Sequence, residues 1–180
     1  MHRYVDGNTY KWTENDVSFP LSSLIQIEFP AQKNLPAFDI FWYDGGMKPF
    51  IPEELKEDKR DMPNEGMMFV GDKGKILAGF RGEDPEIIPS RLMEKYEGEK
   101  VLPERERGPR SNTWAAAIKE DKESPGSFKY AGVVTEAINL AAVALRAGKK
   151  VEYDSKSMKI TNDEAANKYL TREYRKGWEL

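Results

Sequence analysis

The chain has 180 residues, of which 28 are Lys or Arg and 31 are Asp or Glu, so its formal net charge is −3. Charges of both signs are interspersed, and no concentrated basic face of the kind that binds nucleic acid is predicted. The absence of cysteine excludes disulfides, thiolate metal sites and cysteine nucleophiles. The single histidine is His2, so neither a Ser-His-Asp triad nor a histidine-rich metal site is expected.

Two segments are expected, an extended lead-in over residues 1–21 and one domain over residues 22–180. Residues 1–19 are polar and aromatic without a clear period, and the remaining length suits a single core. The first residues lack the apolar centre of a signal peptide. A cytoplasmic location is therefore expected if Met1 is the natural start, whereas an upstream export signal would change it. No apolar run approaches the length of a membrane span, so no membrane contact is expected.

Two alternating segments open the domain. In residues 22–29, Ile25, Ile27 and Phe29 fall on one face of a strand with a wetter opposite face. Residues 37–43 alternate in the same way after a short connection. An antiparallel pair is the natural prediction.

Residues 48–65 are rich in proline and charge, and Pro52 can open a short helical turn. The apolar runs 67–71 and 75–80 flank Gly71-Asp-Lys-Gly74, which predicts a hairpin with Gly74 as a left-handed bulge residue. A short strand is expected at residues 86–88. Ser90 is expected to cap a turn of helix that reaches Tyr96.

Helical patterns dominate the second half. Ser111 or Asn112 is expected to cap a helix carrying Trp114 and Ile118. Residues 130–147 predict the longest helix, with Gly148 at its C′ position. The apolar face expected for that helix is Val134, Ile138, Ala141, Ala142 and Leu145.

Short elements are expected to close the chain. Residues 151–153 and 158–160 predict two strands, and Thr161 with Glu164 forms a capping-box pattern that opens a final helix over 163–169. The tail ends on Trp178, which is expected to dock onto the body.

The order of these elements predicts an α+β fold, with a largely antiparallel or mixed open β-sheet and helices packed on one face. Residues 37–43 carry aromatic or aliphatic side chains on both faces, which are costly to leave in water. The open face is therefore predicted to pack against another subunit or domain.

Nucleotide-binding motifs are missing from the sequence. No Gly-x-Gly-x-x-Gly follows a strand, and no Gly-x-x-x-x-Gly-Lys-Ser/Thr occurs. Gly71-Asp-Lys-Gly74 lies between two strands rather than before a helix, so a hairpin is the better interpretation than a phosphate loop.

The candidate site is the end of the strand at Asp44-Gly-Gly46. There the chain delivers Trp42, Tyr43 and Asp44 to a loop, where they can form one wall for a polar ligand. The alternative is a buried aromatic strand followed by an ordinary turn. Lys48, Arg107 and Arg110 are either ligands for an anionic or hydroxyl-rich molecule or solvated loop charges.

Several motifs together resemble the C-terminal region of a bacterial branch of the Gfo/Idh/MocA oxidoreductases. In chain order, they are Phe41-Trp-Tyr-Asp-Gly-Gly46, residues 68–75, 130–137, 144–150, 160–165 and 173–180. The resemblance covers residues 22–180. It implies an α/β domain that forms one side of a substrate pocket and contributes to oligomer interfaces.

The resemblance also implies an upstream N-terminal Rossmann domain that binds NAD or NADP. Its characteristic motifs are absent here, so no cofactor and no catalytic residue is expected in this chain, and the chain alone is expected to be inactive. The expected partners are that Rossmann domain, a second copy through the open sheet face, and a carbohydrate-like substrate.

The implied substrates are sugars, cyclitols or their derivatives. Trp42 and Tyr43 would stack on or hydrogen-bond to such a substrate, Asp44 would accept hydroxyl hydrogen bonds, and Lys48 is a further candidate. Two alternatives stay open, a stand-alone binding or oligomerisation module and an NAD-dependent glycoside-cleaving relative.

Overall fold

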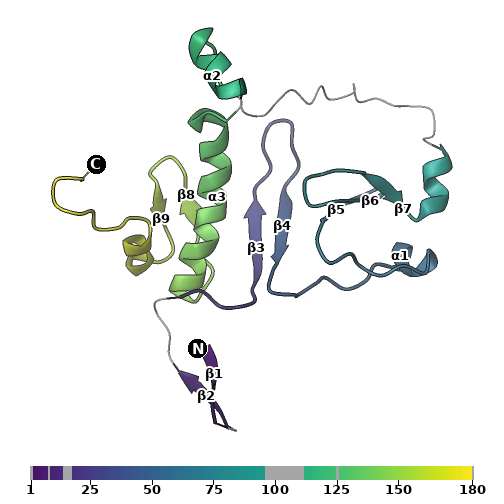
Figure 1. Cartoon of the computed structure of the whole chain (residues 1–180), viewed down its shortest axis with the longest axis horizontal. Coiled ribbons are helices and arrows are strands. Elements are labelled where there is room, and N and C mark those ends of the chain that lie inside the picture. Colours follow the sequence, from purple (N-terminus) through teal and green to yellow (C-terminus); the bar gives the residue numbers. More distant parts are fainter. Residues whose placement is uncertain (1, 8, 14–17, 96–111, 125, 180) are drawn as a thin grey trace. The chain divides into compact units, whose positions relative to one another are not determined.

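The computed structural model describes residues 2–7, 9–13, 18–95, 112–124 and 126–179. Figure 1 shows the helices and strands of the chain, which divides into two compact units. Unit 1 comprises residues 1–21, 25–41 and 108–180, and unit 2 comprises residues 22–24 and 42–107. The described strands form separate sheets of two, two, three and two strands. Helices beside small antiparallel sheets confirm the predicted α+β class, although the strands do not join into one continuous sheet.

The first residues form a hairpin that was not predicted. Strand β1 (His2–Asp6) pairs antiparallel with β2 (Thr9–Thr13), in a register that places Asp6 opposite Thr9. The chain turns back at Gly7, whose φ of 61° is a left-handed value. Asp-Gly is a known turn signal, so Asp6-Gly7 could have predicted this hairpin within the expected lead-in.

The second pair of strands is confirmed. Strand β3 (Leu24–Phe29) and β4 (Phe38–Tyr43) form a two-stranded sheet, and their arrows run in opposite directions in Figure 1. Along β3 the side chains alternate between exposed and half-buried, as the sequence pattern predicted. The rings of Phe29 and Phe38 stack across the pair with centroids 4.8 Å apart.

Unit 2 is built around a small core beneath a three-stranded sheet. The sheet contains β5 (Met67–Gly71), β6 (Gly74–Ala78) and β7 (Glu86–Ile88) in that order. Helix α1 (Glu53–Glu57) follows Pro52, as predicted, and covers one face of this sheet with its buried Leu55. The core is Leu55, Leu77 and Ile88, with Ile51, Met62 and Met68 packed against it.

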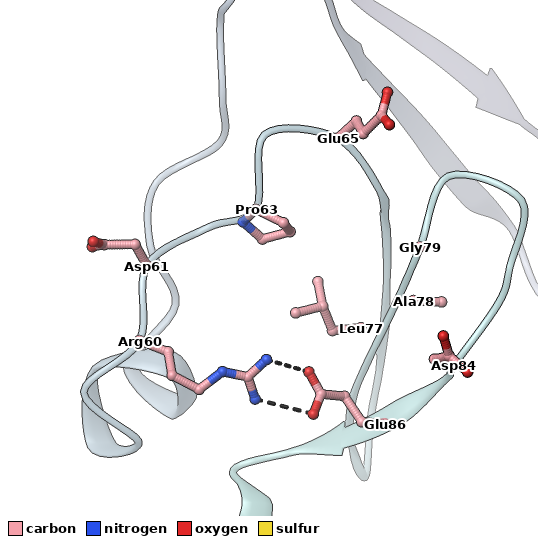
Figure 2. Close-up of a pocket in the computed structure, with 9 residues that line it drawn as sticks. All are labelled: Arg60, Asp61, Pro63, Glu65, Leu77, Ala78, Gly79, Asp84 and Glu86. Carbon is pink, nitrogen blue, oxygen red and sulfur yellow. Dashed lines mark hydrogen bonds and ion pairs between the residues drawn. The ribbon is translucent and has the colours of Figure 1, made fainter.

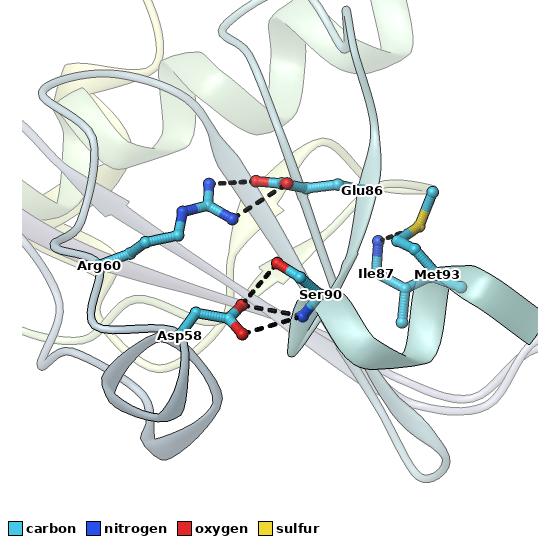
Figure 3. A network of polar contacts seen from close by, with 6 residues as sticks. All are labelled: Asp58, Arg60, Glu86, Ile87, Ser90 and Met93. Atoms are coloured by element: carbon cyan, nitrogen blue, oxygen red, sulfur yellow. Dashed lines mark hydrogen bonds and ion pairs between the residues drawn. The ribbon is translucent and has the colours of Figure 1, made fainter.

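Two local predictions in unit 2 need correction. Gly74 pairs with Gly71 at a φ of 155°, so the hairpin closes through the two-residue turn Asp72-Lys73 rather than through a left-handed bulge. The 3₁₀ helix η1 (Ser90–Lys95) begins at Ser90, but Ser90 does not cap it. The backbone N–H and the hydroxyl of Ser90 instead donate to the carboxylate of Asp58, with the closest contact of each at 2.9 Å (Figure 3).

Two α-helices open the second half of the chain. Helix α2 (Asn112–Lys119) and helix α3 (Phe128–Ala147) lie close to their predicted positions. Gly148 ends α3 at a φ of 67°, and its N–H donates to the carbonyl of Ala144 at 2.9 Å. This is the C-terminal geometry that favours glycine.

The buried face of α3 differs from the predicted one. Val134 and Ile138 are each 61% exposed. Val143 is the buried residue instead, with Leu140 and Ala147 partly buried beside it, whereas Ala141 and Ala142 of the predicted face are half-buried. Because α3 is apolar almost all round, periodicity alone does not select the buried face, which depends on the elements that follow.

Those elements are β8 (Tyr153–Asp154), β9 (Lys159–Ile160) and the 3₁₀ helix η2 (Glu164–Tyr169), seen beside α3 in Figure 1. Val143 of α3 shares a buried cluster with Ile160 and Ala166. The Tyr153 hydroxyl donates to Glu136 on α3 at 2.7 Å. Burial and this carboxylate raise the pKa of Tyr153 to about 12.

The start of η2 is capped by a different residue from the one predicted. Asp163 accepts the backbone N–H of Ala165 at 3.1 Å and is paired with Lys149 at 2.9 Å. The hydroxyl of Thr161 donates instead to the carbonyl of Glu152 at 3.2 Å, so the predicted capping box does not form. Trp178 is 66% exposed, which contradicts the expectation that it docks onto the body.

Helix α3 is long and apolar enough to cross a membrane by length and composition alone, which differs from the expectation of no such stretch. One helix of this kind is weak evidence, because core helices of globular domains share its length and composition, although little of α3 is buried here. Glu136 lies in its middle and is hydrogen-bonded to Tyr153, and its C-terminal half packs on β8, β9 and η2. These contacts favour a helix of a globular domain.

Candidate functional site

The strand end at Asp44 is fixed by a tight turn. The N–H of Met47 donates to the carbonyl of Asp44 at 3.1 Å, and Gly45 and Gly46 have φ values of 61° and 85°. Positive φ at both central positions is the geometry of a type I′ turn, which glycine adopts without strain. The Asp-Gly-Gly sequence therefore ends β4 as predicted.

Asp44 is tied to the residue that precedes β3. Its backbone N–H donates to the carbonyl of Ser23 at 3.1 Å. Its carboxylate accepts the Ser23 N–H at 2.5 Å, the Ser23 hydroxyl at 2.7 Å and the indole N–H of Trp42 at 3.2 Å. The Ser23 hydroxyl is the main cause of a lowered pKa at Asp44, with the Ser23 N–H and Trp42 adding to it against the opposing effect of burial.

Trp42 and Tyr43 leave β4 on opposite faces, as alternation requires. Trp42 is 50% exposed even though its indole nitrogen is bonded to Asp44. Tyr43 is half-buried, and its hydroxyl has no hydrogen-bond partner among the described residues. The structure thus brings Trp42 and Asp44 into contact. No described residue forms a hydrogen bond with the Tyr43 hydroxyl.

Lys48 is directed elsewhere. Its ammonium donates to the carbonyl of Met62 at 3.0 Å and to the side-chain oxygen of Asn64 at 2.8 Å. Two of its three N–H donors therefore hold the loop before β5. Arg107 and Arg110 lie outside the described residues.

Sequence reasoning missed a polar hollow of about 190 Å³ in unit 2 (Figure 2). Arg60 and Glu86 form a bidentate pair in its lining, in which Nη1 donates to Oε2 at 3.0 Å and Nη2 donates to Oε1. The pair raises the pKa of Arg60. The hollow is lined by Arg60, Asp61, Pro63, Glu65, Leu77, Ala78, Gly79, Asp84 and Glu86.

No sequence signal predicts this hollow, because Arg60 and Glu86 are 26 positions apart and meet only when α1 packs on the sheet. A second set of contacts beside it joins Asp58 to Ser90 and the N–H of Ile87 to the sulfur of Met93 at 3.1 Å (Figure 3). These groups satisfy one another. Their arrangement holds α1, β7 and η1 together rather than presenting free donors to a ligand.

No group of three or more metal-ligating side chains is found within the described part of the chain. The β5–β6 loop connects two strands, so it does not direct a helix N-terminus at a phosphate. Helix α3 starts after Ser127, and no strand immediately precedes it among the described residues. The described residues therefore do not fit a dinucleotide, and no chemical step in this chain is assigned to one.

Residues 39–180 match the family described as "Oxidoreductase family, C-terminal alpha/beta domain", the second C-terminal domain type of the Gfo/Idh/MocA proteins. The chain belongs to this family. No significant match is found among curated proteins or among solved structures.

Membership confirms the predicted resemblance to Gfo/Idh/MocA C-terminal domains and implies an N-terminal partner domain in the full enzyme. The family is one of NAD(P)-dependent oxidoreductases. The matched region includes Trp42, Tyr43, Asp44 and Lys48, whereas Ser23 precedes it. The site residues themselves remain predictions, since the family match assigns no role to individual side chains.

Proposed function

We propose that this chain is the substrate-side domain of an NAD(P)-dependent oxidoreductase that acts on a sugar or cyclitol derivative. The observation that carries the proposal is the family match over residues 39–180, which includes the strand end at Asp44. Cofactor binding belongs to the N-terminal domain of the full enzyme, because this chain has no dinucleotide fingerprint. The chain's own residues bind and orient the substrate.

The chemistry of the strand end suits a hydroxyl-rich ligand. The half-exposed indole of Trp42 offers an apolar face on which a sugar ring can stack. The Tyr43 hydroxyl, which has no described partner, can both donate and accept a hydrogen bond, and since it leaves β4 on the face opposite Trp42, the proposed ligand reaches round the strand end to contact both. The Asp44 carboxylate accepts three hydrogen bonds, two from Ser23 and one from Trp42. A carboxylate can accept about four, so one position remains for a substrate hydroxyl.

Lys48 has a secondary role in the proposal. Two of its N–H groups are bonded to Met62 and Asn64, and one remains for a ligand oxygen. The structural bonds give Lys48 a fixed position near the chain that leads into β5. We therefore propose it as a supporting ligand for the substrate, after Trp42 and Tyr43.

Exposed apolar side chains support the proposal that the chain works with a partner. On β4, Ile40 is 43% and Phe41 is 52% exposed, and on α3 Val133 is 70% exposed. Large apolar surfaces of this kind are normally covered in the assembled protein. We propose that the N-terminal domain and a second copy of the chain cover them, the second copy through the β3–β4 faces.

The proposal is tested by Tyr43→Phe in an enzyme that contains this domain together with its nucleotide-binding domain. Loss of one substrate hydrogen bond is expected to raise KM for the sugar or cyclitol up to about tenfold. The Kd for NAD(P) is expected to stay unchanged, because Tyr43 does not belong to the cofactor site.

Tyr130→Phe is the matched control, since Tyr130 is 56% exposed on α3 and loses the same single oxygen. Steady-state kinetics and a cofactor titration give both constants. An unchanged KM in Tyr43→Phe, or an equal rise in both variants, would contradict the placement of the substrate at this strand end.

A further inference from the structure

Ser23 and Asp44 join the two open ends of the β3–β4 hairpin. A backbone hydrogen bond of 3.1 Å runs from the Asp44 N–H to the Ser23 carbonyl, and the Ser23 N–H returns to Asp44 Oδ1 at 2.5 Å. These two bonds involve the Ser23 main chain and do not depend on its side chain. The Ser23 hydroxyl adds a third contact, to Oδ2 at 2.7 Å.

The same Oδ2 atom accepts the indole N–H of Trp42 at 3.2 Å. An indole nitrogen can only donate, and Oδ2 is the protein acceptor that it uses here. The Ser23 hydroxyl helps to fix the rotation of the Asp44 carboxylate, because it bonds to Oδ2 while the Ser23 N–H bonds to Oδ1. The orientation of the half-exposed Trp42 ring on β4 is thereby linked to Ser23, the residue that precedes β3.

We infer that Ser23 and Asp44 form a clasp that fixes the indole of Trp42 in the orientation in which it meets the substrate. In this role Ser23 and Asp44 are positioning residues that act through Trp42. The inference rests on the proposed function for its purpose, but its geometry can be tested without any substrate. It assigns a role to Ser23, which lies outside the region matched by the family.

The test follows the indole N–H of Trp42 by ¹H–¹⁵N NMR on the full 180-residue chain, with the resonance assigned through Trp42→Phe. In Ser23→Ala the indole proton is expected to shift and to exchange with solvent up to about tenfold faster, as loss of one supporting hydrogen bond allows. Asp44→Asn is expected to have a larger effect. If the new amide side chain keeps its oxygen towards the Ser23 N–H, its NH₂ group lies where Oδ2 was. Two N–H donors, the amide and the Trp42 indole, then face each other.

Two variants separate positioning from a general loosening of the hairpin. Ser23→Thr keeps the hydroxyl and is expected to restore the resonance of the natural protein. Ser22→Ala removes the neighbouring bond from the Ser22 hydroxyl to the Gly45 carbonyl, 3.0 Å long, and is expected to leave Trp42 unchanged.

An indole resonance that is the same in Ser23→Ala, Asp44→Asn and the natural chain would overturn the clasp. So would an equal shift in Ser22→Ala. The proposed function is judged separately, by the effect of Tyr43→Phe on KM. The spectra can show the clasp while Tyr43→Phe leaves KM unchanged. That result would refute the substrate site but would support the contact between Ser23, Asp44 and Trp42.

Discussion

Replacing Leu55 with alanine is expected to lower the unfolding free energy of unit 2 by about 2–5 kcal/mol, the usual cost of truncating a fully buried leucine. Leu55 is 0% exposed and contacts Leu77 and Ile88. It is the one buried residue of α1, so its loss removes the apolar contact of this helix with the sheet.

Hydrogen exchange of the β6 backbone amides measures the stability of this unit directly. Phe50→Ala is the control, because Phe50 lies shortly before α1 and is 99% exposed. Its truncation is expected to change stability by no more than about 0.5 kcal/mol. Equal effects of the two substitutions would show that Leu55 is not the centre of this core.

Asn167→Ala is expected to lower the unfolding free energy of unit 1 by about 2–3 kcal/mol, because it leaves half-buried backbone groups unpaired. The Asn167 side chain accepts the N–H of Ile160 at 2.9 Å and donates to the carbonyl of the same residue at 3.0 Å. In this way it connects η2 to β9, where Ile160 is 2% exposed. Water cannot readily replace both bonds at this position.

Asn162 provides a matched comparison for this substitution. Its amide accepts the N–H of Glu152 at 2.8 Å and donates to the carbonyl of Lys150 at 3.1 Å, but these contacts are exposed. Asn162→Ala is therefore expected to cost only about 1 kcal/mol, since water takes over the bonds. Denaturant unfolding of the two variants gives the comparison. If both substitutions lower the unfolding free energy equally, burial does not explain the effect of Asn167→Ala.

Local signals in the sequence predicted the elements that depend on neighbouring residues. The hairpin around Asp72-Lys73, the turn at Gly45-Gly46 and the end of α3 at Gly148 all follow from glycine and its flanking pattern. The family resemblance also rested on such segments, and the match over residues 39–180 confirms it.

Features that depend on distant residues could not be predicted. The buried face of α3 is selected by Ile160 and Ala166, which pack against a helix with apolar residues almost all round. The Arg60–Glu86 pair forms only when α1 meets β7. For the same reason, the sequence identified Asp44 as a candidate ligand but gave no indication that Ser23 and Trp42 occupy most of its carboxylate.

The central claim is that this chain provides the substrate side of an oxidoreductase and leaves cofactor binding to another domain. Titration of the 180-residue chain with NAD⁺ and NADP⁺ by calorimetry tests it most directly. We expect no stoichiometric binding of either nucleotide, because neither Gly-x-Gly-x-x-Gly after a strand nor Gly-x-x-x-x-Gly-Lys-Ser/Thr occurs in the sequence. Binding of one NAD⁺ or NADP⁺ per chain would contradict the claim.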